Sequence, residues 1–284
     1  MGMTAAAKIP SVVFENVSFR FSEHGEWIVK DINISIAPGE WISIVGGNGS
    51  GKSTFVKLVN GLLKPSLGKV IVFGESTDNA NLRKIRQSAG IIFQNPDEQT
   101  VGATVEEDIA FGLQNLMFPR DEMISRIDRI LKLLQLESLR GRPVRMLSGG
   151  QKQLVAIAGI LVMHPQIIIF DEATSMLDPH NAGKLIGVMS ELHRMGLTVL
   201  QVTHDPEDIW RADRILVLNN GHLAFAGDIP TLMKQSDILE EAQTLPPFLV
   251  RLHKALRQKG IKLPAWSSSE KEVAKLIWEL CSTT

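Results

Sequence analysis

Gly46-Gly47-Asn48-Gly49-Ser50-Gly51-Lys52-Ser53-Thr54 is the most informative segment of this chain. It matches the pattern GxxxxGK[ST], in which glycine-rich backbone wraps around phosphate oxygens and points its N–H groups inward. The apolar run Trp41–Val45 before it is typical of a buried strand, and Phe55–Leu63 after it is typical of a helix. A strand, this loop and a helix in that order predict a phosphate site at a helix N-terminus, rather than a glycine-rich turn that only opens a helix.

The loop supplies most of the expected nucleotide-binding residues. Lys52 is expected to bridge the β- and γ-phosphates of ATP, and the Ser53 hydroxyl is expected to bind Mg²⁺. The other expected contacts to the nucleotide come from Gly46, Asn48, Gly49, Ser50, Gly51 and Thr54.

A second chemical signal lies at the end of an apolar run. Ile167–Phe170 is followed directly by Asp171 and Glu172. Acids after an apolar strand are common and carry little information alone. Beside a phosphate loop they become specific, because ATP hydrolysis needs such carboxylates. We expect Asp171 to hold the magnesium shell and Glu172 to polarise the attacking water as general base.

Composition excludes several classes of protein. The 284 residues are 44% hydrophobic and 21% charged, which is ordinary globular usage, and the formal net charge is −1. A near-neutral chain is a poor candidate for binding nucleic acid or a membrane by charge alone. Cys281 is the only cysteine, so neither a disulfide framework nor a cysteine-rich metal site is expected. No apolar run approaches the ~18 residues of a membrane span, and MGMTAAAKIP is not a secretory signal, so we expect an intracellular, soluble chain.

Alternating strand and helix patterns predict an α/β fold with a mainly parallel sheet covered by helices. Between about 95 and 164 apolar residues recur at helical spacing, and another helix is expected near 180–195. Gly221 and Gly227 punctuate a hairpin-like stretch, and a helical tail broken by Pro246-Pro247 and Pro264 follows. The other expected strands are Ser11–Phe14, Val17–Phe21, Ile32–Ile36, 69–73, 89–93, Ile167–Phe170, Thr198–Val202 and Ile215–Leu218.

A third motif points to a family. Leu147–Gln153 reads LSGGQKQ, and its Ser148 precedes Asp171 by 23 residues (171 − 148). Taken alone it is a polar cap before a helix expected at 153–163. Beside the phosphate loop it resembles the LSGGQ signature of ATP-binding-cassette (ABC) ATPases. The resemblance implies that ATP lies between two cassettes, so that Ser148, Gly149, Gly150 and Gln151 cap the nucleotide of a partner.

The same resemblance assigns further residues. Gln94 is similar to the glutamine that contacts magnesium, takes part in catalysis and faces the membrane partner; Ser175–Asp178 is similar to the D-loop, with Asp178 near the nucleotide. His204, 32 residues after Glu172 (204 − 172), resembles the histidine that contacts the γ-phosphate. Phe21 resembles the aromatic residue that stacks on adenine, for which any ring face suffices. Strand alternation places Phe19 and Phe21 on one face, so a core role for Phe21 stays open.

Two segments narrow the family. Phe93–Gln99 (FQNPDEQ) with Val101–Val105, and Asp171–Pro179 (DEATSMLDP) with Gly159, look like the first ATPase paralogue, an A component, of energy-coupling-factor (ECF) transporters. Such importers take up vitamins and other micronutrients. The resemblance implies a second ABC ATPase, favouring a paralogue, a transmembrane scaffold (T component) and a substrate-binding membrane protein (S component). It places the chain peripherally at the cytoplasmic face of the cell membrane, with no nucleic acid partner.

The resemblance implies a P-loop NTPase core with an antiparallel β subdomain and a helical signature subdomain. The expected nucleotide-binding domain is 11–235, with its helical subdomain at about 95–164. Residues 236–284 are a C-terminal helical extension, expected either to contact the second ATPase or merely to cap the chain.

Three residues depart from the common family pattern. Gly47 replaces a proline or histidine and is expected to loosen the loop slightly. Leu154 replaces an arginine, which puts either the coupling or the dimer affinity in question. Met176 replaces an alanine or glycine but matches the ECF subgroup.

Two other functions compete with transport. One is a soluble ABC ATPase acting on ribosomes or nucleic acid. Members of that kind carry two cassettes or long coiled coils, which a chain of this length without heptads does not provide. The other is a nucleotide-binding regulator without turnover, which the presence of Glu172, Gln94 and His204 disfavours.

Overall fold

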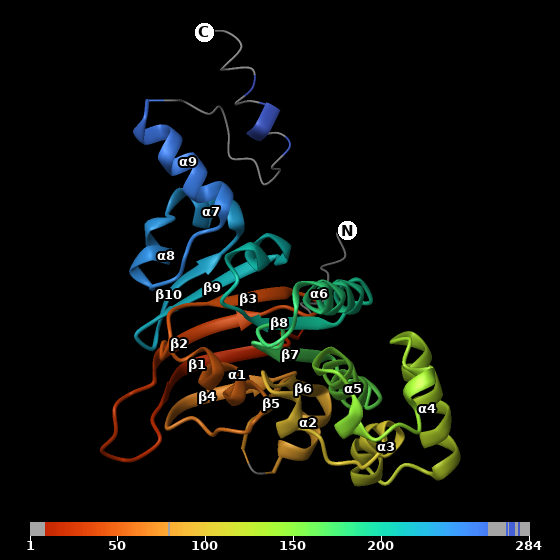
Figure 1. Ribbon diagram of the computed structural model, residues 1–284. Coiled ribbons are helices and arrows are strands. Elements are labelled where there is room, and N and C mark those ends of the chain that lie inside the picture. Colours follow the sequence, from red (N-terminus) through yellow and green to blue (C-terminus); the bar gives the residue numbers. More distant parts are fainter. Residues whose placement is uncertain (1–8, 79, 261–270, 272, 276–277, 279–284) are drawn as a thin grey trace, which may run out of the picture.

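A six-stranded sheet organises the chain in the order β10-β9-β3-β8-β7-β6 (Figure 1). All neighbouring strands are parallel except β10 and β9. Three central strands are buried along their whole length, which explains their unbroken apolar sequences. The strands are β3 (Trp41–Val45), β6 (Ala89–Ile92), β7 (Ile167–Asp171), β8 (Thr198–Val202), β9 (Arg214–Asn219) and β10 (His222–Gly227). This computed structural model describes residues 9–78, 80–260, 271, 273–275 and 278.

A smaller antiparallel sheet has the order β2-β1-β4-β5. Its strands are β1 (Val12–Phe19), β2 (Val29–Ile36), β4 (Leu67–Val72) and β5 (Glu75–Ser76). The two short strands expected over 11–21 are one strand with irregular pairing on either side of Val17, where Asn16 has a φ of 49°. Gly and Asn tolerate that conformation, so the chain bends at Asn16 without ending the strand.

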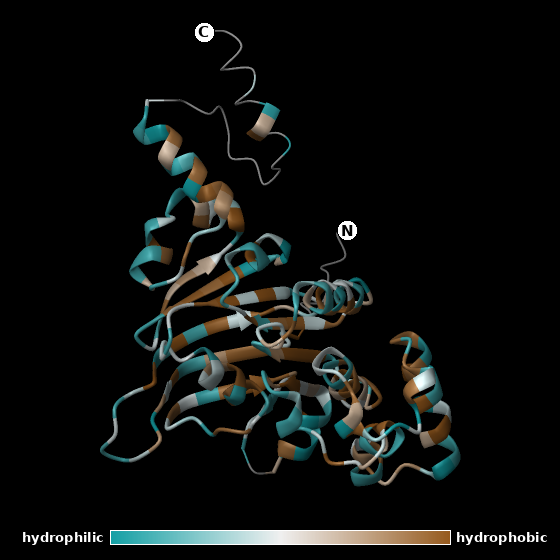
Figure 2. Ribbon diagram, in the orientation of Figure 1, coloured by the Kyte–Doolittle hydropathy of each residue, from teal (hydrophilic) through white to brown (hydrophobic). Residues whose placement is uncertain are grey.

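Helix α1 (Lys52–Val59) packs between the two sheets. The Phe14 ring from β1 stacks on the Phe55 ring from α1 with centroids 4.4 Å apart. The helix starts and ends earlier than the predicted 55–63, because Gly51 and Gly61 adopt positive φ at its two ends. Short α2 (Leu82–Ser88) leads into β6. Figure 2 shows the hydrophobic residues concentrated in the strands of the six-stranded sheet.

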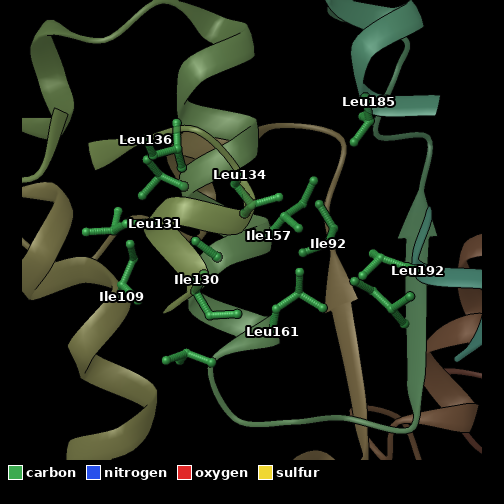
Figure 3. Packing of buried hydrophobic residues seen from close by; sticks show 14 of the residues in the cluster. Ile92, Ile109, Ile130, Leu131, Leu134, Leu136, Ile157, Leu161, Leu185 and Leu192 are labelled. Carbon is green, nitrogen blue, oxygen red and sulfur yellow. The ribbon is translucent and has the colours of Figure 1, made fainter. Parts of the chain in front are cut away.

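Helices fill the stretch expected to be helical between β6 and β7. The α-helices are α3 (Val105–Asn115), α4 (Arg120–Leu133) and α5 (Gly149–Leu161). The short 3₁₀-helices, labelled η, are η1 (Pro96–Glu98), η2 (Glu137–Leu139) and η3 (Val144–Met146). Their apolar side chains, including Ile109, Leu131 and Ile157, form one cluster with Leu185 and Leu192 of α6 (Pro179–Arg194) (Figure 3). The helical region is therefore packed continuously against the central sheet.

The C-terminal part covers β9 and the end of β3. It begins after η4 (Pro206–Arg211) and the β9–β10 hairpin, and consists of α7 (Ile229–Lys234), α8 (Asp237–Glu241) and α9 (Phe248–Gln258). Leu232, Leu239 and Val250 pack on Val45 and Val217 in a third core cluster. Helix α7 had no sequence prediction. Pro264 and Cys281 lie outside the described residues. No described helix has the length and apolar character that crossing a membrane requires.

Candidate active site

The phosphate loop connects β3 to α1 and needs glycine at two places. A Cβ on Gly46 would lie 2.2 Å from the Leu218 carbonyl oxygen, and one on Gly51 would lie 2.8 Å from the Ile28 carbonyl oxygen. Gly51 is the N-cap of α1 with φ 101°, and no side chain caps the helix. The first N–H groups of α1 are thus left to a ligand, which is the arrangement that binds anions.

Lys52 lies inside the loop. Its Nζ donates to the carbonyl oxygens of Gly46 and Gly47, both at 2.9 Å. Burial lowers the pKa of Lys52, and the negative charges of Glu172 and Asp171 oppose this effect. An ammonium held by two backbone carbonyls beside two carboxylates is poised to exchange those contacts for phosphate oxygens.

Asp171 ends β7 and faces Ser53. The Ser53 hydroxyl donates to Asp171 Oδ1 at 2.9 Å. Burial raises the pKa of Asp171, while the Ser53 hydrogen bond and the charge of Lys57 act against the rise. Among the described residues no three His, Cys, Asp or Glu side chains gather as a metal cage. The Ser53 hydroxyl and the Asp171 carboxylate are hard oxygen donors, which suit Mg²⁺, an ion usually held by few protein oxygens together with substrate phosphates.

Glu172 and His204 meet at the ends of β7 and β8. Their Oε1 and Nε2 atoms are 2.7 Å apart. The backbone of Glu172 has φ 55°, a costly conformation for a non-glycine residue, and its N–H donates to the Val202 carbonyl. Glu172 also lines a cavity of about 220 Å³ with Ile28 and residues 48–54. Glu172 therefore borders the space where a phosphate on the loop would lie.

Gln94 joins this group indirectly. Its Nε2 donates to Ser175 Oγ at 3.1 Å, and Ser175 Oγ donates to the Glu172 carbonyl at 2.8 Å. The hydrogen bond of Gln94 thus goes to the D-loop rather than to Ser53 or Asp171. Asp178 accepts from the backbone N–H groups of His180 and Asn181 and so caps α6; these bonds, with that of the Asn181 side chain, lower its pKa.

The signature residues stand apart from the phosphate loop. Ser148 caps α5, and Gln151 returns a hydrogen bond to the Ser148 N–H, so the helix begins at Gly149 and not at the predicted 153. Ser148, Gly150 and Gln151 line a different cavity, of about 540 Å³, with Asn181 and the half-buried Leu154. None of the residues lining the cavity at the phosphate loop lines this one.

Phe21 lies beyond the end of β1 and is 72% exposed. Its ring meets the buried Phe19 ring edge-on with centroids 5.0 Å apart. The expectation that both rings share one strand face is wrong, because the strand ends at Phe19. A core role for Phe21 is thereby excluded, and stacking on adenine stays a prediction.

The C-terminal extension reaches the phosphate loop, a contact that sequence reasoning missed. The Gly47 N–H donates to the Ala242 carbonyl at 2.7 Å, and a Cβ on Gly47 would lie 3.1 Å from that oxygen and from Gln243 Cβ. The loosening expected from Gly47 is therefore offset by an external hydrogen bond.

A buried polar network behind His204 was also missed. Gln201, Thr203 and Asp208 are buried, and the side chains of Gln201 and Thr203 both donate to the Asp208 carboxylate. Its sequence signal was the polar Gln201 within the apolar strand Thr198–Val202.

A glycine loop that places Lys52 beside carboxylates at the ends of parallel strands defines the class of P-loop ATPases. Residues 29–175 match the family model described as ABC transporter. The energy-coupling factor transporter ATP-binding protein EcfA1 of Halalkalibacterium halodurans is 40% identical over 96% of this chain and 98% of that protein.

Solved structures of similar proteins also belong to the ABC family. CbiO1 from Clostridium perfringens, part of the ABC transporter complex cbiONQ, matches with a TM-score of 0.74 and 34% identity over 86% of this chain and 99% of that one. The ATP-binding cassette MJ0796, in a dimeric post-hydrolysis state bound to ADP and Pi, matches with a TM-score of 0.68 and 31% identity over 77% of this chain and 98% of that one.

The chain therefore belongs to the energy-coupling factor transporter ATP-binding proteins of the ABC family. The predictions of the fold class, of an ABC-type ATPase and of the ECF subgroup are confirmed. The comparisons favour the transporter interpretation over a soluble ABC ATPase acting on ribosomes or nucleic acid.

Proposed function

We propose that this chain binds and hydrolyses ATP with Mg²⁺ to drive an ECF-type importer, as one of two cassettes that enclose the nucleotide between them. The observation that carries the proposal is the separation of the signature from the phosphate loop. The loop, Asp171, Glu172 and His204 form one group, whereas Ser148 lines another cavity together with Gly150, and Ser148 and Gly149 are both exposed. A second chain has to supply the missing cap of the nucleotide.

In this proposal each residue at the loop has a distinct task. The N–H groups of the loop and Lys52 hold the phosphates, and Ser53 and Asp171 hold Mg²⁺, which when bound neutralises phosphate charge. Glu172 accepts the proton of the attacking water, because it borders the loop cavity and carries a carboxylate. His204 holds that carboxylate at 2.7 Å, and we assign to it the contact with the γ-phosphate.

We assign the membrane partner to a groove of about 510 Å³ between α2, α3 and α5. It is lined by Arg83, Arg86, Gln99, the exposed Phe111 and Gly159. Gln99 donates to the Ile91 carbonyl and accepts from the Phe93 N–H, so it is tied to the strand end that carries Gln94. A helix of the T component seated here would act directly on the segment of Gln94.

The remaining partners follow from the family. The second cassette is a paralogue, and a substrate-binding S component completes a complex that keeps this chain at the cytoplasmic face of the cell membrane. The exposed Leu245 and Phe248 support contact of the C-terminal extension with the second cassette.

The proposal is tested by a tagged pull-down from detergent-solubilised membranes of the source cells, with the co-purifying chains identified by mass. A second cassette together with polytopic membrane proteins is the expected result. Recovery of ribosomal or other soluble partners alone would leave the ATPase chemistry standing and overturn the transport role.

A further inference from the structure

Asp208 is a buried carboxylate with no task in the proposed hydrolysis. It lies in η4, four residues after His204, and is 2% exposed. Its Oδ2 accepts hydrogen bonds from Gln201 Nε2 and from Thr203 Oγ1, both at 2.8 Å. The nearby Arg211 guanidinium is 3.9 Å from Oδ1 and is itself 45% exposed. Burying a carboxylate costs free energy, and burial raises the pKa of Asp208, so packing alone gives no reason for an acid here.

Asp208 is linked to the backbone next to His204 through the Thr203 hydroxyl. A hydroxyl has one hydrogen to donate, and Thr203 gives it to Asp208. This orients the oxygen of Thr203 so that it accepts from the Asp205 N–H at 3.0 Å. Thr203 and Asp205 flank His204 on either side. One hydroxyl, oriented by one carboxylate, therefore fixes the backbone on both sides of the histidine.

The network is anchored to the central sheet at its other end. Gln201 Oε1 accepts from Trp41 Nε1 at 3.1 Å, while Gln201 Nε2 donates to Asp208. Trp41 begins β3, the strand that leads into the phosphate loop. Side-chain hydrogen bonds thus connect the segment around His204 to β3, the same strand that positions Lys52.

We propose that Asp208 is a positioning residue for His204, and that it acts through the Thr203 hydroxyl. Through this bond it holds the imidazole at hydrogen-bonding distance from the Glu172 carboxylate. The inference rests on the proposed function, since it matters for turnover only if His204 takes part in hydrolysis.

The test is a double-mutant cycle on ATP hydrolysis by the assembled transporter. Thr203→Val keeps the shape and removes the hydroxyl, and should lower kcat at least about tenfold while changing KM less than about threefold. Thr203→Ser restores the hydroxyl and should recover most of kcat. Asp208→Asn keeps one carbonyl acceptor but loses the charge, and its kcat should lie between those of Thr203→Val and Thr203→Ser. In a His204→Ala background, Thr203→Val should cause less than about a twofold further loss.

A matched control comes from the other end of β8. Thr198 is also buried, and its hydroxyl bonds to Ser11 Oγ and the Gly39 N–H, far along the strand from His204. Thr198→Val carries the same chemical change and should leave kcat within about twofold of the original chain.

The outcomes distinguish the positioning role of Asp208 from the role of His204 in hydrolysis. If Thr203→Val lowers kcat by the same factor with and without His204, or if both Thr203→Val and Asp208→Asn leave kcat unchanged, Asp208 does not act through the histidine. If His204→Ala itself leaves turnover intact, the role of His204 in the proposed function is lost, and the positioning role is overturned with it. If Thr203→Val fails to fold, Asp208→Asn is taken through the same cycle with the same criteria.

Discussion

The chain has two glycine-rich helix starts, and they are built differently. Helix α1 begins at a left-handed Gly51 without a side-chain cap, so its first N–H groups are open. Helix α5 begins with Ser148 and Gln151, which satisfy each other's backbone N–H groups. The first start carries its own cation, Lys52, whereas the signature segment 148–151 has no charged side chain. Similar residues thus leave the backbone N–H groups open at one helix start and satisfy them at the other. In the proposed function the first start is a complete phosphate site, and the second is half of a site that a partner completes.

Gly149 differs from Gly46 and Gly51 in what surrounds it. Gly46 and Gly51 are required by backbone oxygens that approach within 3 Å of a built Cβ. Around Gly149, within the part of the chain that the structure describes, nothing lies within 4 Å of such a Cβ. A side chain at Gly149 would therefore meet no described part of this chain, which makes the position suitable for substitutions that test a contact with a partner.

The largest effect is expected at the complete site. Glu172→Gln should lower ATP turnover by about 10²–10⁴-fold, because the amide cannot accept the proton of the attacking water, while ATP binding is retained. Turnover by the assembled complex and nucleotide binding measured by fluorescence titration check this. Glu137→Gln, at an exposed position in η2, is the control. Near-normal turnover of Glu172→Gln would remove Glu172 as the base.

The second prediction concerns the half site. Gly149→Asp places a negative charge at the start of α5, which is neutral or stabilising for the isolated chain. Facing a partner's phosphates, the same charge should lower turnover about 100-fold, since like charges brought together cost several kcal/mol. Binding of ATP to the isolated chain should not change.

Gly149→Asn is the matched neutral control for that charge. Complexes in which only one cassette carries Gly149→Asp locate the defect. A defect confined to the nucleotide held by the altered chain's own phosphate loop would contradict the assignment across the interface.

Lys52 provides an intermediate effect that sharpens the comparison. Lys52→Ala removes the cation of the loop, and hydrogen bonds to charged groups contribute about 1.5–3 kcal/mol, so ATP affinity should fall about 10–100-fold. Equilibrium binding to the isolated chain measures it, with the exposed Lys64→Ala as control. Unchanged affinity would mean that the backbone alone holds the phosphates.

The smallest effect is expected at Gly47. Gly47→Ala brings a methyl group to 3.1 Å from the Ala242 oxygen, so the extension must shift slightly, at a cost of about 1 kcal/mol. The melting temperature should fall by about 2–4 °C. Gly187→Ala, on α6 where a Cβ meets nothing within 4 Å, should not lower it. An unchanged melting temperature for Gly47→Ala would show that the extension yields freely.

Local patterns predicted the buried strands well and the helix starts poorly. Trp41–Val45 and Thr198–Val202 have the expected bounds because unbroken apolar runs are themselves the signal for a buried parallel strand. Helix α1 starts at a left-handed glycine, and α5 starts at a capping pair. Neither feature changes the hydrophobic periodicity from which the helices were predicted.

The site divides in the same way. The resemblance to ABC ATPases implied that His204 belongs with Asp171 and Glu172, and the structure brings them to adjacent strand ends. The path from Gln94 through Ser175 to Glu172 was beyond prediction, because it joins segments 81 residues apart by a single hydroxyl. Such contacts depend on tertiary packing rather than on any local pattern.

The hydrogen bond between the Gly47 N–H and the Ala242 carbonyl joins the first turn of the phosphate loop to the C-terminal extension. Glycine at 47 lets the extension's backbone come within hydrogen-bonding distance of the loop. Thermodynamic linkage then applies in both directions. Whatever factor ATP binding imposes on the seating of the extension, the seating of the extension imposes on ATP affinity. ATP binding at the phosphate loop and the seating of the C-terminal extension are thus linked equilibria. The linkage can be measured by following either of them.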